Sequence, residues 1–212
     1  MNSKDTRGFV LLSDVVPHIV QEIRYFSTFN FVGDRVDGYE EPIALLTHDA
    51  ARALKAVSNE MMVKGYRLKV FDAYRPVTAV KHFIYGAIED EDIRMKPYFY
   101  PDINKQDAFE LGYIAKRSSH SRGSAIDLTL LDMKTGREVD MGGPFDLFGE
   151  LSHPDFRGVT DEQYANRMLL RAAMERNGFV PYECEWWHFR LVNEPFPDTY
   201  FNFPVSQRSV KA

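Results

Sequence analysis

One segment in the amino-terminal half of the chain has the hydrophobic periodicity of an amphipathic helix. In residues 48–64 the apolar side chains recur at intervals of three and four, so that they gather on one face. Thr47 precedes this segment as a candidate N-cap, and Gly65 follows it as a stop. A second helix is expected over residues 76–88, because it opens with a proline, which suits the first turn of a helix.

A third helix is predicted after Thr160. This residue forms a capping box with Gln163, and an apolar stripe at helical spacing then runs until shortly before Gly178. The long segments between the predicted elements differ in character. Residues 89–106 mix an acidic run with aromatic residues and are expected to form a solvated excursion. Residues 132–160 are rich in Gly, Pro and Asp, and a loop of that length often covers a functional site.

Three segments have the pattern of β-strands. Apolar residues alternate in 67–71 and in 125–131, where the alternation with polar residues predicts a half-buried strand, and 186–192 is expected to form the last strand. Residues 9–32 are expected to form short strands and turns. Since helices and strands are mixed without a regular βαβ rhythm, we predict an α+β fold, and we expect residues 1–212 to form one domain.

Composition and charge narrow the classes of protein that remain. Hydrophobic residues make up 44% and charged residues 27% of the 212 residues, ordinary values for a folded chain. The 31 acidic residues outnumber the 26 lysines and arginines, and this net charge of -5 argues against nucleic acid as a partner. Cys184 is the single cysteine, so no internal disulfide can form. No apolar run has the length of a secretory or membrane-spanning segment, so we expect a cytoplasmic protein without a membrane partner.

Two of the six histidines stand in patterns that favour a metal site. His120 precedes Asp127 by seven residues, and Gly123 between them permits a tight turn that brings the two together. His188 follows Glu185 by three residues. Two imidazoles and a carboxylate form a tetrahedral zinc site with one position open for water, as in catalytic zinc sites. Such a metal lowers the pKa of its bound water to about 7, and Glu185 is then a candidate general base.

The spacing of Glu185 and His188 sets a condition on this interpretation. Residues three apart on a regular strand point to opposite faces, so the two side chains can share a site only if 185–187 form a turn, a bulge or the start of a strand. The other interpretation of EWWH is an exposed Glu185 and a histidine packed by Trp186 and Trp187. The spacing by itself leaves both interpretations open.

Arg75 lies in the sequence DAYRP, at a predicted corner between a strand and a helix where catalytic groups are often presented. An arginine there could hydrogen-bond a scissile carbonyl and stabilise the oxyanion. A structural salt bridge to Asp72 explains the residue equally well. A thiol nucleophile is not expected at Cys184, because the sequence places no base to activate it.

Three blocks of sequence together resemble the D-alanyl-D-alanine dipeptidases of the zinc D,D-peptidase family. They are DAYRP at 72–76, SSHSRGSAID at 118–127 and EWWH at 185–188. The blocks fill the broad family pattern S-x-H-x-x-G-x-A-x-D followed far downstream by E-x-x-H, in the same order and with similar separation. The segment RYFSTFNFVG at 24–33 is similar to the amino-terminal block of the dipeptidase branch, so the resemblance covers most of the chain.

The resemblance implies a site for one zinc ion per chain. By this resemblance His120, Asp127 and His188 are the metal ligands, Glu185 is the base, and Arg75 polarises the substrate carbonyl. The implied fold has a central, mainly antiparallel sheet flanked by helices, of the hedgehog and D,D-peptidase type.

The resemblance also implies residues that bind the substrate. Tyr25 and Ser118 are expected to contribute, and Asp146 in the MGGPFD loop is a candidate partner for the substrate ammonium group. A dipeptidase must also recognise a free carboxylate, for which Ser118 or a basic group is a candidate.

The implied reaction is zinc-dependent hydrolysis of D-Ala-D-Ala to two D-alanines. The closest alternative is a D,D-carboxypeptidase that acts on peptidoglycan stem peptides, which predicts an open cleft and activity on acylated D-Ala-D-Ala. A third hypothesis is a zinc-binding module without activity, which would need neither Glu185 nor Arg75. A small dipeptide is the one partner that these patterns specify, and they specify no oligomeric state.

Overall fold

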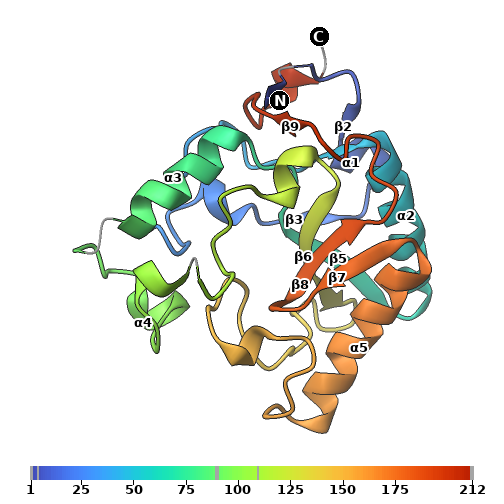
Figure 1. The fold of residues 1–212 in the computed structure, drawn as a ribbon. Coiled ribbons are helices and arrows are strands. Elements are labelled where there is room, and N and C mark those ends of the chain that lie inside the picture. The colour runs from blue at the N-terminus through green and yellow to red at the C-terminus, as the bar shows by residue number, and fades with distance from the viewer. Residues whose placement is uncertain (1, 4, 89–90, 109, 211–212) are drawn as a thin grey trace.

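The computed structural model describes residues 2–3, 5–88, 91–108 and 110–210. Its centre is a five-stranded sheet in the order β3-β5-β6-β8-β7 (Figure 1). In that order the strands are β3 (Val20–Gln21), β5 (Tyr66–Asp72), β6 (Ala125–Asp132), β8 (Glu185–Leu191) and β7 (Phe179–Tyr182). Only β3 and β5 pair in parallel within this sheet of described residues; the other pairs are antiparallel. The predicted α+β fold with a mainly antiparallel sheet is therefore confirmed.

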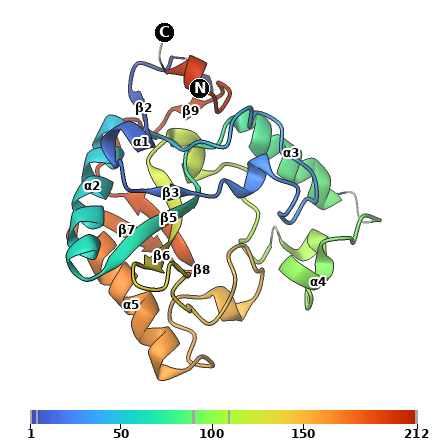
Figure 2. The same cartoon turned by 180° about the vertical axis from the view of Figure 1, so that it is seen from behind.

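Two long helices pack on one side of this sheet, α2 (His48–Val63) on β5 and α5 (Asp161–Arg176) on β7; they lie at the right in Figure 1 and at the left in Figure 2. Both begin as the sequence predicts. The Thr47 hydroxyl accepts a hydrogen bond from the backbone N–H of Ala50, and Thr160 and Gln163 form the reciprocal bonds of a capping box. Because these caps and the apolar stripes are local features, the sequence predicts the two helices to within a few residues.

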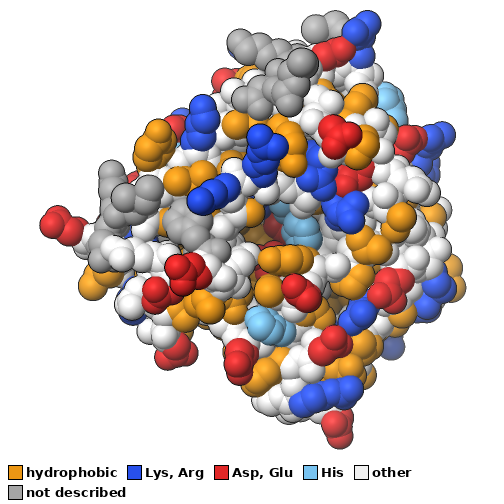
Figure 3. Space-filling view, viewed as in Figure 1, with side chains coloured by type: hydrophobic (Ala, Val, Ile, Leu, Met, Phe, Trp, Pro, Cys, Tyr) orange, Lys and Arg blue, Asp and Glu red, His pale blue; other side chains and the backbone are white. Residues whose placement is uncertain are grey.

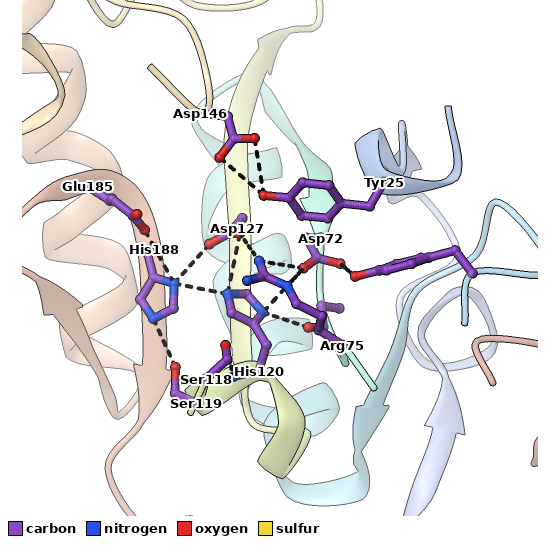
Figure 4. A network of polar contacts seen from close by, with 12 residues as sticks. Tyr25, Asp72, Arg75, Ser118, Ser119, His120, Asp127, Asp146, Glu185 and His188 are labelled. Carbon is purple, nitrogen blue, oxygen red and sulfur yellow. Dashed lines mark hydrogen bonds and ion pairs between the residues drawn. The ribbon is translucent and has the colours of Figure 1, made fainter. Parts of the chain in front are cut away.

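Loops and short helices face the opposite side of the sheet. The longest of these helices is α3 (Val77–Ile88), which confirms the helix predicted after Pro76. The shorter segments are α4 (Lys96–Phe99), η2 (Lys105–Ala108), η3 (Ser119–Arg122) and η4 (Glu150–Ser152). This side of the sheet, away from α2 and α5, is where the candidate site lies (Figure 4).

The predicted strand 125–131 forms, but the expectation that it is half-buried is wrong. The first six residues of β6 are buried, including the polar Asp127 and Thr129, whose exposed fractions are 2% and 1%. Thr129 shares the lining of a small cavity with Met141, Phe145 and Trp186. These residues lie outside β6, so the alternation within the strand contains no sign of the burial.

The amino-terminal region departs from the expected strands and turns. Between β2 (Phe9–Leu11) and β3 the chain forms one helical turn, α1 (Leu12–Val15), and a 3-10 segment, η1 (Arg24–Phe26), follows β3. A four-residue helix is too short to show helical periodicity, so the pattern could not predict α1. β2 pairs in an antiparallel manner with β4 (Leu45–Thr47).

The carboxy-terminal tail packs back onto the body of the protein. β9 (Tyr200–Phe201) pairs in parallel with β1 (Asn2–Ser3), and η5 (Gln207–Ser209) follows. Tyr74 stacks on Phe203 at a centroid distance of 4.3 Å, and its hydroxyl donates to the Phe203 carbonyl at 2.9 Å. This contact anchors the DAYRP corner that carries Arg75. No helix in the described ranges combines the length and apolar character needed to cross a bilayer.

Candidate active site

The register of the central sheet brings two potential metal ligands together. Asp127 on β6 is paired with His188 on the neighbouring strand β8. His120 lies on η3, just before β6, and Gly123 ends that segment with a left-handed backbone at φ 79°. The tight turn expected at Gly123 is thus observed, and it folds His120 back over the start of β6.

A side chain at position 123 would be strained for two reasons. L-residues rarely adopt the positive φ, and a Cβ atom would lie 2.2 Å from the ring of the buried Phe9. We expect Gly123→Ala to lower the free energy of unfolding by about 2–5 kcal/mol, measured by urea denaturation. Gly136→Ala is the matched control, because Gly136 has φ 69° but nothing within 4 Å of its added Cβ. Equal effects of the two substitutions would contradict the steric argument.

The three potential ligand atoms lie at metal-coordinating separations (Figure 4). His120 Nε2 lies 3.0 Å from His188 Nδ1 and 3.3 Å from an Asp127 carboxylate oxygen, and His188 Nδ1 lies 3.0 Å from the other oxygen. Ligands of a tetrahedral zinc ion, at metal distances of about 2.0–2.1 Å, are about 3.3 Å apart. The donor set therefore fits a zinc ion.

The remaining ring nitrogens of the two histidines support this assignment. His120 Nδ1 lies 2.6 Å from the Ala73 carbonyl oxygen, to which it must donate a proton, so its Nε2 lone pair points toward His188. His188 Nε2 lies 3.2 Å from the Ser119 hydroxyl. Metal-binding histidines usually make such second contacts, which orient the ring and select its tautomer.

The protonation states also suit metal binding. Burial alone would raise the pKa of Asp127, but the imidazoles of His120 and His188 hold it well below its usual range. Burial lowers the pKa of His188, against the opposing effect of Asp127. Both shifts favour the unprotonated forms that coordinate metals.

Glu185 meets the condition that its spacing from His188 imposes. It is the first residue of β8, where the pairing with β7 is irregular between Pro181 and Tyr182. One Glu185 carboxylate oxygen lies 3.8 Å from His188 Nδ1, and the side chain is 15% exposed, so the alternative of an exposed Glu185 does not hold. Burial, together with the charges of Asp127 and Asp146, raises the pKa of Glu185 well above its usual value.

The salt bridge expected between Arg75 and Asp72 forms, and Arg75 also lines the cavity of the candidate site. Its Nε donates to Asp72 at 2.8 Å, which is the expected salt bridge, and its Nη2 lies 3.6 Å from the Asp127 carboxylate. The Tyr39 hydroxyl donates to the other Asp72 oxygen at 2.7 Å. Burial alone would lower the pKa of Arg75, but Asp72 and the other nearby acidic groups raise it well above its usual value, so the guanidinium stays charged. Sequence reasoning did not identify Tyr39, which no motif marks.

Tyr25 and Asp146 meet at one wall of the site. The Tyr25 hydroxyl lies 3.1 and 3.2 Å from the two Asp146 carboxylate oxygens. Asp146 has φ 67°, and among the described residues it is the only non-glycine residue with positive φ. Burial is the main cause that raises its pKa to about 7. A strained, buried carboxylate of this kind is typical of a functional position.

One cavity of about 370 Å³ is lined by all eight residues singled out from the sequence. They are Tyr25, Arg75, Ser118, His120, Asp127, Asp146, Glu185 and His188. Ser118 has a visible local role as well, because its hydroxyl accepts a hydrogen bond from the backbone N–H of His120 at 3.2 Å and caps η3. Ser119, adjacent to His120 in the SSHS block, was missed although its position next to a ligand could have suggested it.

Three potential metal ligands, a neighbouring carboxylate and an ion-paired guanidinium line one cavity, an arrangement typical of metal-dependent hydrolases. The sequence model of the peptidase M15 family, described as D-ala-D-ala dipeptidase, matches residues 5–206. The chain therefore belongs to this family of metallopeptidases.

Individual relatives agree with the family assignment. The D-alanyl-D-alanine dipeptidase of Enterococcus faecalis is 42% identical over 94% of this chain and 98% of its own length. The protein of the same name from Streptomyces coelicolor is 40% identical over 95% of this chain and 100% of its own. The one from Escherichia coli is 35% identical over 88% and 86%, respectively.

Proposed function

We propose that this protein is a zinc-dependent dipeptidase that hydrolyses D-Ala-D-Ala to two D-alanines. The observation that carries the proposal is the convergence of His120, Asp127 and His188 beside Glu185 in one cavity of a chain that belongs to this peptidase family. These three residues would hold a zinc ion, which when bound polarises a carbonyl and lowers the pKa of water.

Glu185 is proposed as the general base. Its carboxylate borders the ligand atoms, within 3.8 Å of His188 Nδ1, and takes the proton of the attacking water. The same carboxyl group can then return that proton to the leaving amine, because the group that accepts a proton as a base can donate it as an acid in the next step. One residue thus serves both steps.

Arg75 is proposed to stabilise the negative charge that develops on the substrate carbonyl oxygen. Asp72 fixes the guanidinium, and the rings of Tyr25 and Phe83 each lie 4.9 Å from its central carbon. A preorganised cation needs no rearrangement as the charge appears, which makes the stabilisation effective.

Asp146 and Tyr25 are proposed to bind the free ammonium group of the dipeptide. Their polar atoms face the cavity from a buried position, and a carboxylate there offers the ammonium a charged partner. An acylated substrate has no ammonium group, so it would leave that carboxylate without a charged partner and is expected to bind more weakly. This favours a dipeptidase over a D,D-carboxypeptidase.

The test is D-alanine release from D-Ala-D-Ala and from N-acetyl-D-Ala-D-Ala, each with and without a chelator. We expect turnover of the free dipeptide alone, lost on chelation and restored by added zinc. Turnover of the acylated substrate would place the protein among the D,D-carboxypeptidases and remove the proposed role of Asp146. Turnover that survives complete metal removal would overturn the zinc mechanism.

A further inference from the structure

The cavity carries opposite charges in its depth and at its rim. The buried carboxylates of Asp127 and Asp146 lie in the depth. Three arginines line the rim, namely Arg117, Arg122 and Arg190. In the space-filling view, basic side chains gather on one side of the hollow in which a histidine is visible (Figure 3). A zwitterionic ligand would therefore meet a potential that orients it.

Two of the rim arginines are held by one buried carboxylate. Arg122 donates through Nε and Nη2 to the two oxygens of Glu194, both at 2.8 Å, and Arg190 donates to the same carboxylate at 2.8 Å. The Glu194 side chain is only 3% exposed. Since two guanidinium groups share one carboxylate, this cluster keeps a net positive charge, but much of its donor capacity is used.

Arg117 differs from its two neighbours. Within the described parts of the chain, no carboxylate lies at ion-pairing distance from it, and its contact is with the Tyr200 ring, 5.3 Å from the centroid. The residue is exposed on the cavity rim. It precedes the ligand His120 by three residues, which span at most about 11 Å of chain. The N–H groups of its guanidinium can therefore bind a ligand at the rim of the cavity.

We propose that Arg117 binds the terminal carboxylate of the dipeptide and thereby sets the direction in which the substrate enters. This inference rests on the proposed function. A fully extended dipeptide spans about 7 Å, so a substrate whose ammonium group lies at Asp146 must place its carboxylate on another side of the metal ligands. The planar guanidinium group of an arginine can bind a carboxylate through two hydrogen bonds. The Tyr200 ring contacts the guanidinium group of Arg117, and the positive charge of the nearby Arg122 also attracts the substrate carboxylate.

The test compares Arg117→Met with the unaltered enzyme, loaded with zinc, on D-Ala-D-Ala and on D-Ala-D-alaninamide, which lacks the carboxylate charge. We expect the substitution to raise KM for the dipeptide about tenfold to a hundredfold and to change kcat less than about threefold, because the contact binds substrate and transition state alike. For the amide, KM should be the same in both enzymes. Arg117→Lys should restore part of the loss, since it keeps the charge but not the fork.

Arg157→Met is the matched control. Arg157 is also exposed and stacked on a tyrosine, with its central carbon 3.7 Å from the centroid of the Tyr164 ring, but it does not line the cavity. Its replacement should leave KM for both substrates unchanged. An unchanged KM in Arg117→Met, or an equal rise for dipeptide and amide, would overturn the role of Arg117 while leaving the proposed function intact. If the unaltered enzyme with zinc releases no D-alanine from the dipeptide, the proposed function itself fails.

Discussion

Replacing Glu185 with glutamine is expected to lower kcat for D-Ala-D-Ala by about 10²–10⁴-fold, the range that a positioned general base contributes. Glutamine keeps the shape of the side chain at the start of β8 but cannot accept the proton of the attacking water. It also removes one buried carboxylate close to Asp127 and Asp146, whose charges raise the pKa of Glu185. The fold should therefore be retained, and the loss should appear in kcat.

The zinc content of the variant distinguishes the loss of a general base from the loss of the metal site. Because Glu185 is not one of the three proposed ligands, Glu185→Gln should bind zinc in a one-to-one ratio, measured by metal analysis after dialysis. Glu183→Gln is the matched control, since Glu183 lies on the same hairpin but is exposed, and it should keep full activity. Substantial turnover by Glu185→Gln would show that another group acts as the base.

The second large effect is expected from Asp127→Asn, which removes a ligand charge while keeping the shape of the side chain. The carboxylate bridges His120 and His188 at 3.3 and 3.0 Å, so its loss should weaken zinc binding by at least about a hundredfold. Isothermal titration calorimetry measures this directly. Zinc that binds only the folded protein raises its unfolding temperature. Excess zinc should therefore raise the unfolding temperature of the unaltered protein far more than that of Asp127→Asn.

A substitution on the same strand provides the control for this prediction. Asp132 ends β6, and its carboxylate accepts hydrogen bonds from backbone N–H groups of the following turn, a role that asparagine also performs. Asp132→Asn should bind zinc with unchanged affinity. Comparable affinities for Asp127→Asn and the unaltered protein would exclude Asp127 as a ligand.

The site residues that could be predicted from the sequence lie in short, contiguous motifs. His120, Gly123 and Asp127 lie within eight residues, and a single left-handed turn at Gly123 joins them. In contrast, the spacing of Glu185 and His188 could not show that they share a site, because a regular strand would separate them. The irregular pairing of β7 with β8 at Tyr182 brings both to the cavity. That irregularity arises between two strands and has no signature in EWWH.

The surroundings of the site were less predictable still. Several of its features depend on contacts between segments far apart in the chain. They are the burial of the polar face of β6, the hydrogen bond of Tyr39 to the Asp72 that holds Arg75, and the ion pairs of the rim arginines with Glu194. Asp146 was identified through family resemblance alone, and its positive φ is visible only in the folded loop. Long-range contacts of this kind leave no periodic trace in a sequence.

By itself the sequence determined the helices α2, α3 and α5 and the strands β5, β6 and β8, because caps and hydrophobic periodicity act over a few residues. It also determined, through its motifs, which side chains could carry the chemistry. Only the tertiary structure decided that these side chains meet in one cavity, and that Arg117 on its rim has no carboxylate partner among the described residues. The reason is physical: sheet register and loop packing set distances between residues that are far apart in the chain, such as Tyr25 and Asp146, which are separated by 121 positions.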